Sequence, residues 1–203
     1  GTKSGVVVID KKTDDSRRYT TSERLPHNNI NQLVADGSGK ALIATESNRL
    51  YYLDPQEGVI SGKAVIRGGI RNSFQSFDKD KWNKIWGATE TSGIYCFERD
   101  SVWNINSRSG LLSDNCYSLL CDSKDNIWVG HLGGFSFYNQ GQDILRSFTD
   151  VFLPGALCND NAIYETADGH ILIGTTEGFL VYNPAEDKSK LYPPRTNIIS
   201  VTI

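Results

Sequence analysis

The sequence predicts an all-β protein built from repeated four-stranded sheets of about 44 residues each. Nineteen glycines, nine tyrosines, eight phenylalanines and four tryptophans in 203 residues favour short, aromatic-rich strands joined by tight turns. Apolar and polar residues alternate along these segments, which is the pattern of strands and not of helices. A third observation, a motif that returns at a nearly constant interval, predicts sheets stacked around an axis. This architecture is a β-propeller.

Five segments carry the motif in register. Each ends in an acid or an amide, and the intervals between these closing residues are 44, 44, 41 and 44. The residue at the turn before the third strand returns at the same intervals. Two independent anchors with the same period indicate a true repeat. A β-sandwich is the alternative architecture, but sandwiches rarely repeat at sequence level. The closing residues are Asp10, Asp54, Glu98, Asn139 and Asn183, and the turn residues are Gly5, Arg49, Gly93, Gly134 and Gly178.

Each unit is predicted to contain four short strands. The first is an apolar segment, the second holds an Ile-Trp pair or its equivalent, the third follows the turn, and the fourth is looser. We expect a propeller segment over residues 1–192, with repeats near 30–73, 74–115, 116–160 and 161–192 and a partial blade at 1–29. We expect these four full blades and partial ones to be a piece of a larger propeller, with one blade face exposed.

Large apolar side chains of the second strand are predicted to fill the contact between blades. They are Trp86 and Trp128, and the equivalent pairs Leu42-Ile43 and Leu172-Ile173 in the copies without tryptophan. Burying each contributes roughly 2 to 3 kcal/mol.

The glycines at the turn before the third strand have a predicted backbone role. Gly93, Gly134 and Gly178 are expected to adopt a positive φ, which glycine tolerates best. Arg49 departs from this pattern, and Asn48 beside it is expected to relieve the departure.

Composition argues against several functional classes. The net charge of -3, with both signs interspersed, gives no basic surface for nucleic acid. The sequence contains no run of about 18 apolar residues, so we expect neither a membrane span nor a secretory signal within this stretch. The spacing of Cys96, Cys116, Cys121 and Cys158 fits no zinc motif, so we expect neither a metal site nor a cofactor, and free thiols in preference to a disulfide.

The motif resembles a known family. It is similar to the two-component regulator propeller repeat, whose order is Asn or Ser, an apolar strand, Asp, a Gly-containing turn, Ile-Trp-Val-Gly-Thr, Gly-Leu and Tyr-Asn. The resemblance runs from Thr2 to Tyr192. Such repeats form the periplasmic sensor region of hybrid two-component systems, found largely in gut Bacteroidetes. The third copy departs from the family in having His131 where threonine is usual.

The resemblance implies a function for the parent protein. It implies a periplasmic segment of an inner-membrane receptor that senses an oligosaccharide and passes the signal to a histidine kinase in another domain. The partners would be the remaining propeller and β-sandwich domains of that receptor. The tail from Leu191 resembles the junction between the two, which places residues 193–203 at the start of the β-sandwich.

Candidate ligand-binding residues lie mainly at the turn after the Ile-Trp strand, since propellers bind ligands through loops at one mouth of the channel. Glu46, Glu90, His131 and Glu177 occupy this turn in successive copies. A sugar also needs an aromatic platform with polar neighbours, and Trp103, Tyr117, Trp82 and Arg71 are the candidates. Packing or surface roles are the alternative for each of them.

Other functions are possible for a propeller. A lyase would need a histidine and an acid paired across the channel, but His27, His131 and His170 occupy unrelated positions. A glycoside hydrolase would need paired carboxylates, which the sequence does not locate. We therefore predict no catalytic residues in this segment. A propeller that binds proteins without a small ligand is the remaining alternative, and open blade faces would favour a homodimer.

Overall fold

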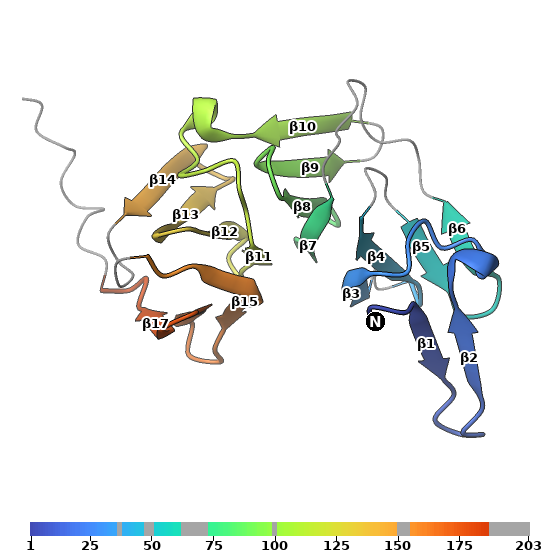
Figure 1. The fold of residues 1–203 in the computed structure, drawn as a ribbon. Coiled ribbons are helices and arrows are strands. Elements are labelled where there is room, and N and C mark those ends of the chain that lie inside the picture. Colours follow the sequence, from blue (N-terminus) through green and yellow to red (C-terminus); the bar gives the residue numbers. More distant parts are fainter. Residues whose placement is uncertain (36–37, 47–50, 62–72, 99–100, 150–154, 187–203) are drawn as a thin grey trace, which may run out of the picture.

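The computed structural model places a series of antiparallel sheets in an arc around a common centre (Figure 1). It describes residues 1–35, 38–46, 51–61, 73–98, 101–149 and 155–186. Within these ranges there are one two-stranded, one three-stranded and three four-stranded sheets. The prediction of an all-β propeller is confirmed.

The strands follow one another along the chain as meanders. The half-blade comprises β1 (Val6–Ile9) and β2 (Ser16–Tyr19). Blade 1 comprises β3 (Ile30–Ala35), β4 (Ala41–Thr45), β5 (Tyr51–Asp54) and β6 (Gly58–Ser61). Blade 2 comprises β7 (Phe74–Lys79), β8 (Ile85–Thr89), β9 (Ile94–Glu98) and β10 (Ser101–Ile105). Blade 3 comprises β11 (Ser118–Cys121), β12 (Asn126–His131), β13 (Gly134–Asn139) and β14 (Ile144–Thr149). Blade 4, within the described ranges, comprises β15 (Cys158–Glu165), β16 (Ile171–Thr175) and β17 (Gly178–Tyr182).

The first strand of each blade lies innermost. β3 contacts β7, β7 contacts β11, and β11 contacts β15 (Figure 1). β7 also contacts β15, and the side-chain amide of Asn161 donates a hydrogen bond of 3.2 Å to the backbone carbonyl of Asn31. The inner strands of blades 1 to 4 therefore converge on one narrow axis.

The connections divide between two faces of the arc. Because neighbouring strands are antiparallel, the first and third turns of every blade lie on one face, which we call the odd-turn face. The described parts of the second turns and of the links between blades lie on the opposite face, which we call the connector face. Two of these links contain 3-10 helices, at Thr21–Glu23 and Ser107–Ser109.

The hydrophobic core consists of separate clusters, each between two neighbouring sheets. Trp86 of blade 2 is fully buried against Leu119 and Ile127 of blade 3. Trp128 repeats this arrangement one blade further along, against Ile163 and Ile171 of blade 4. Burial between blades, and not within them, therefore supplies the hydrophobic stabilisation.

A buried aspartate organises the first turn of blades 2 and 3. In blade 3, Asp122 Oδ1 accepts the backbone N–H groups of Lys124 (2.9 Å) and Asn126 (2.8 Å), and Oδ2 accepts the indole N–H of Trp128 (2.8 Å). Asp80 makes the same bonds in blade 2, including one of 3.2 Å to the indole of Trp86. One carboxylate thus satisfies the turn and the buried tryptophan together.

The turn glycines differ in one respect from the prediction. Gly93 and Gly178 have positive φ values of 74° and 133°, but Gly134 does not, and Gly133 has a φ of 74° instead. A Cβ on Gly134 would lie 2.0 Å from the carbonyl oxygen of Phe148, so glycine is needed there for the close approach of β13 and β14. Arg49 and Asn48 lie outside the described residues.

One face of blade 4 is apolar and exposed. Tyr164, Phe179 and Val181 are 64%, 73% and 51% exposed, whereas their counterparts on the other face of the sheet pack against blade 3. This is the kind of exposed blade face that the sequence predicted.

Replacing the turn aspartate should destabilise the protein. Asp122→Ala leaves the buried indole N–H of Trp128 without an acceptor, so we expect the free energy of unfolding to fall by about 2 to 3 kcal/mol. Lys124→Ala changes the same turn but keeps the carboxylate, and should have an effect within about 0.5 kcal/mol. Urea denaturation measures both. Equal stability of the two variants would contradict the assigned role of Asp122.

Candidate functional site

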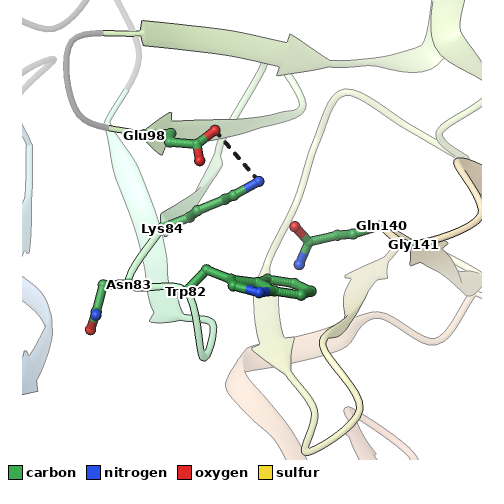
Figure 2. A pocket seen from close by; sticks show the side chains of 6 residues that line it. All are labelled: Trp82, Asn83, Lys84, Glu98, Gln140 and Gly141. Carbon is green, nitrogen blue, oxygen red and sulfur yellow. Dashed lines mark ion pairs between the residues drawn. The ribbon is translucent and has the colours of Figure 1, made fainter.

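A cleft of about 670 Å³ opens on the odd-turn face between blades 2 and 3. Figure 2 shows the side chains around it. Its volume lies within the usual range for small-molecule sites. We call it the Trp82 cleft. Its lining residues are Trp82, Asn83, Lys84, Glu98, Gln140 and Gly141.

The first turn of blade 2 presents the indole of Trp82 to solvent. Asp80 Oδ1 accepts the backbone N–H groups of Trp82 (3.0 Å) and Lys84 (2.9 Å), which fixes the turn. Asn83 between them has a φ of 62°, a left-handed conformation that asparagine tolerates. The side chain of Trp82 is 51% exposed as a result, unlike the buried Trp86 that follows it.

Blade 3 provides the opposite wall. The side-chain amide of Gln140 donates to Asp80 Oδ2 of blade 2 and to the carbonyl of Asp125 in its own blade, both at 3.1 Å. The backbone N–H of Lys81 also donates to Asp125 Oδ1 at 3.1 Å. These bonds hold the two walls in fixed relation, so the cleft is preformed.

The charges in and beside the cleft are balanced. Lys84 Nζ lies 3.5 Å from Glu98 Oε2, as Figure 2 shows, and Lys81 forms an ion pair with Asp125. The ammonium groups of Lys81 and Lys84 lie 4.5 and 5.7 Å from the ring centroid of Trp82, within cation–π range. Because each ammonium has a carboxylate partner, the cleft favours a neutral ligand over an ionic one.

This combination suits a ligand with many hydroxyl groups. The indole offers an apolar surface for the C–H face of a sugar ring. The amide of Gln140 provides its oxygen as an acceptor, because both of its N–H bonds are donated to Asp80 and Asp125, and Lys84 and Glu98 add one charged donor and one charged acceptor. An aromatic platform with polar neighbours is what a sugar site needs, and Trp82 is one of the residues predicted to provide it.

Three of the predicted glutamates lie apart on the connector face. Glu46, Glu90 and Glu177 are exposed and belong to blades 1, 2 and 4. Glu46 accepts a hydrogen bond of 2.9 Å from the Asn29 amide and lies 3.4 Å from His27 Nε2, and Glu90 accepts one of 3.3 Å from Ser73. None of the three lines the Trp82 cleft.

The predicted aromatic candidates other than Trp82 pack between blades. The ring of Trp103 lies 4.9 Å from that of Trp86 in an edge-to-face arrangement. Tyr117 is half-buried against the cluster between blades 3 and 4. Arg71 lies outside the described residues.

His131 is buried in blade 3. Its Nδ1 lies 3.0 Å from the carbonyl oxygen of Asn115 and its Nε2 lies 3.1 Å from Ser136 Oγ. Burial lowers the pKa of the imidazole to about 4, so it is neutral at physiological pH. The side chain therefore bridges two parts of the blade and cannot reach a ligand in solvent.

Most residues of the cleft were not predicted from the sequence. Lys84 and Glu98 belong to the repeated motif and looked structural, while Gln140 lies in a turn that carries no motif. The useful signal was Trp82 itself, because the corresponding turn position holds Ser38, Lys124 and Asp168 in the other blades. Tryptophan usually buries most of its surface, so an exposed tryptophan at this turn is a signal of function.

Several other site types are absent from the described ranges. No group of three His, Cys, Asp or Glu side chains is placed there to hold a metal ion. All four cysteines are free, and burial raises the pKa of Cys96 and Cys158 to about 12, which makes these thiols unreactive. In this part of the chain, no helix has the length and apolar character needed to cross a membrane.

Comparison with known proteins agrees with the fold. Residues 110–133 match the family model for the two component regulator propeller, which confirms the predicted repeat. No curated protein matches the chain in sequence. The chain is similar to the extracellular domain assigned to the hybrid two component system BT3049 from B. thetaiotaomicron, with 18% identity, a TM-score of 0.80, and coverage of 98% of this chain and 29% of that one.

Two further structures are similar. One is the extracellular domain assigned to the hybrid two component system BT4673 of the same organism, with 18% identity, a TM-score of 0.69, and coverage of 92% and 24% of the two chains. The other is a catalytically inactive virginiamycin B lyase from Staphylococcus aureus, with 13% identity, a TM-score of 0.67, and coverage of 92% and 65%. At these identities the likeness shows the propeller fold, and the chain spans less than a third of the two sensor domains.

The buried His131 should make stability depend on pH. Its pKa is about 4 when folded and near 6.5 when unfolded, so its protonation favours the unfolded state as the pH falls from about 6.5 towards 4. At pH 4.5 the protein should have lost about 2.5 kcal/mol from this group relative to neutral pH.

His131→Thr supplies the control, because Thr45, Thr89 and Thr175 hold this position in the other blades. Urea denaturation at neutral pH and at pH 4.5 should show a smaller acid loss in the variant than in the wild type. The same acid loss in both proteins would contradict a buried neutral imidazole.

Proposed function

We propose, starting from the two-component regulator propeller repeat at residues 110–133, that the chain is a ligand-sensing segment of a hybrid two-component receptor. Its ligand is a neutral oligosaccharide, which binds in the Trp82 cleft. The chain lies in the periplasm as part of an inner-membrane receptor whose histidine kinase is a separate domain. Likeness in fold to the extracellular domains of B. thetaiotaomicron supports this location.

The observation that carries the proposal is the exposed indole of Trp82 beside the amide of Gln140 and a balanced ion pair. An exposed tryptophan costs hydrophobic free energy, so its presence at a preformed cleft favours a binding role. Stacking would bury the indole, and the fixed amide of Gln140 would select ring hydroxyls by direction.

The positions of the histidines favour binding over catalysis. His131 is buried, His27 pairs with Glu46, and His170 Nδ1 lies 2.8 Å from Asp168 Oδ2 within a single exposed turn. Proton abstraction by a lyase would require a base facing an acid across a bound substrate. The likeness in fold to virginiamycin B lyase makes this the rival activity to test.

A thermal-shift screen against host and plant oligosaccharides tests the proposal. A ligand at 100 times its dissociation constant should add about 2.7 kcal/mol of stability. Trp82→Ala should lose this shift without a large change in basal stability, because the side chain is exposed. Glu90→Ala on the connector face is the matched control and should keep the shift.

The other outcomes assign the function differently. If no oligosaccharide stabilises the protein, the proposal fails, and a protein-binding propeller and a lyase are the remaining alternatives. If the shift survives Trp82→Ala but is lost in Glu90→Ala, the site lies on the connector face.

A further inference from the structure

A second cleft of about 420 Å³ lies on the odd-turn face between blades 3 and 4. Like the Trp82 cleft, it is bounded by the first turn of one blade, the end of that blade's third strand and a turn of the next blade. We call it the Arg146 cleft. Its polar lining residues include Lys124, Asn126, Asn139, Gln142, Arg146 and Glu165.

The two clefts share one construction. In each, the residue after the turn aspartate donates its backbone N–H to a carboxylate of the following blade. Lys81 donates to Asp125 at the Trp82 cleft, and Ser123 donates to Glu165 Oε2 at 2.7 Å at the Arg146 cleft. The hydroxyl of Ser123 adds a second bond of 2.7 Å to Glu165 Oε1. Both clefts are therefore closed towards the axis by the same kind of contact between blades.

The two clefts differ in the side chains that line them. Where the Trp82 cleft has the ion pair of Lys84 and Glu98, the same register positions of blade 3 hold Asn126 and Asn139, joined by a hydrogen bond of 2.9 Å. The second cleft lacks an exposed tryptophan among its lining residues and has Lys124, Gln142 and Arg146 instead, while the amide of Asn126 donates to Asp122. It therefore offers hydrogen bonds to a hydroxylated ligand where the first offers a stacking surface.

The β13–β14 turn lies between the two clefts. Gln140 and Gly141 of the β13–β14 turn line the Trp82 cleft, and Gln142 of the same turn lines the Arg146 cleft. Gly141 has no side chain to obstruct passage over the turn, and the nearest atom to an added Cβ would be 3.6 Å away. Because packed sheets lie about 10 Å apart, a short ligand would fill one cleft and a longer one could reach both.

We propose that the protein binds an extended oligosaccharide that crosses the end of blade 3, with one part on Trp82 and another in the Arg146 cleft. This inference rests on the proposed function and adds the size of the ligand to it. Recognition would then select chain length, since the second cleft contributes only when the ligand is long enough to cross Gly141.

Calorimetric titration with disaccharides and hexasaccharides of the xylan, amylose and cellulose series tests the inference. The hexasaccharide of a binding series should bind at least about tenfold more tightly than its disaccharide. Gly141→Tyr places a bulky ring on the crossing point at a residue without a positive φ, and should reduce the hexasaccharide to the affinity of the disaccharide. Glu90→Ala on the connector face, outside both clefts, is the control and should change neither affinity.

Arg146→Gln tests the second cleft directly. It should weaken hexasaccharide binding and leave disaccharide binding unchanged, with an unfolding midpoint measured in parallel to show that the variant is folded. If short and long ligands bind with equal affinity and Gly141→Tyr changes neither affinity, the inference is overturned. The proposed function would still stand in that case if disaccharide binding depended on Trp82. Absence of binding by every series, short and long, would overturn both.

Discussion

The buried carboxylate at the first turn of blades 2 and 3 is the interaction on which the rest of this structure depends. Asp80 and Asp122 each have two oxygens, and each uses one to fix a turn and the other to hold the indole of a buried tryptophan. The tryptophan then fills the contact with the next blade. Blade 4 lacks both groups, because Leu172 replaces the tryptophan there and Thr166 replaces the aspartate, whereas blade 1 keeps Asp36 with Leu42 in place of the tryptophan. The hydroxyl of Thr166 is sufficient in blade 4, because it has no indole N–H to bind and only accepts the backbone N–H of His170 in the turn.

The same constraint makes a ligand site possible. A turn held by an internal carboxylate needs nothing from its exposed side chains, so the position of Trp82 is free to carry a functional residue. Gln140 then uses the remaining capacity of Asp80 to connect blade 3 to this turn. Structure and candidate site therefore share one group: the carboxylate that stabilises the blade also sets the distance between the walls of the cleft.

The fold was predictable because the blade interface repeats, and a repeated interface leaves a repeated sequence pattern. The site was less predictable because it arises between blades. Glu98 and Gln140 line one cleft, yet they belong to different repeats, and nothing in the motif says which turns lie side by side. The prediction favoured the turn after the Ile-Trp strand, where Glu46, Glu90 and Glu177 lie on separate blades and His131 is buried. The positive φ expected at Gly134 falls on Gly133, because a pattern of two adjacent glycines does not show which one turns the chain.

The central claim is that a sugar ligand lies between blades on the odd-turn face. A crystal structure of the protein with the oligosaccharide that gives the largest thermal shift tests this most directly. We expect a sugar ring stacked on the indole of Trp82, with hydroxyl groups bonded to Gln140 or Glu98. A sugar bound on the connector face near Glu90, with Trp82 still exposed to solvent, would contradict the account.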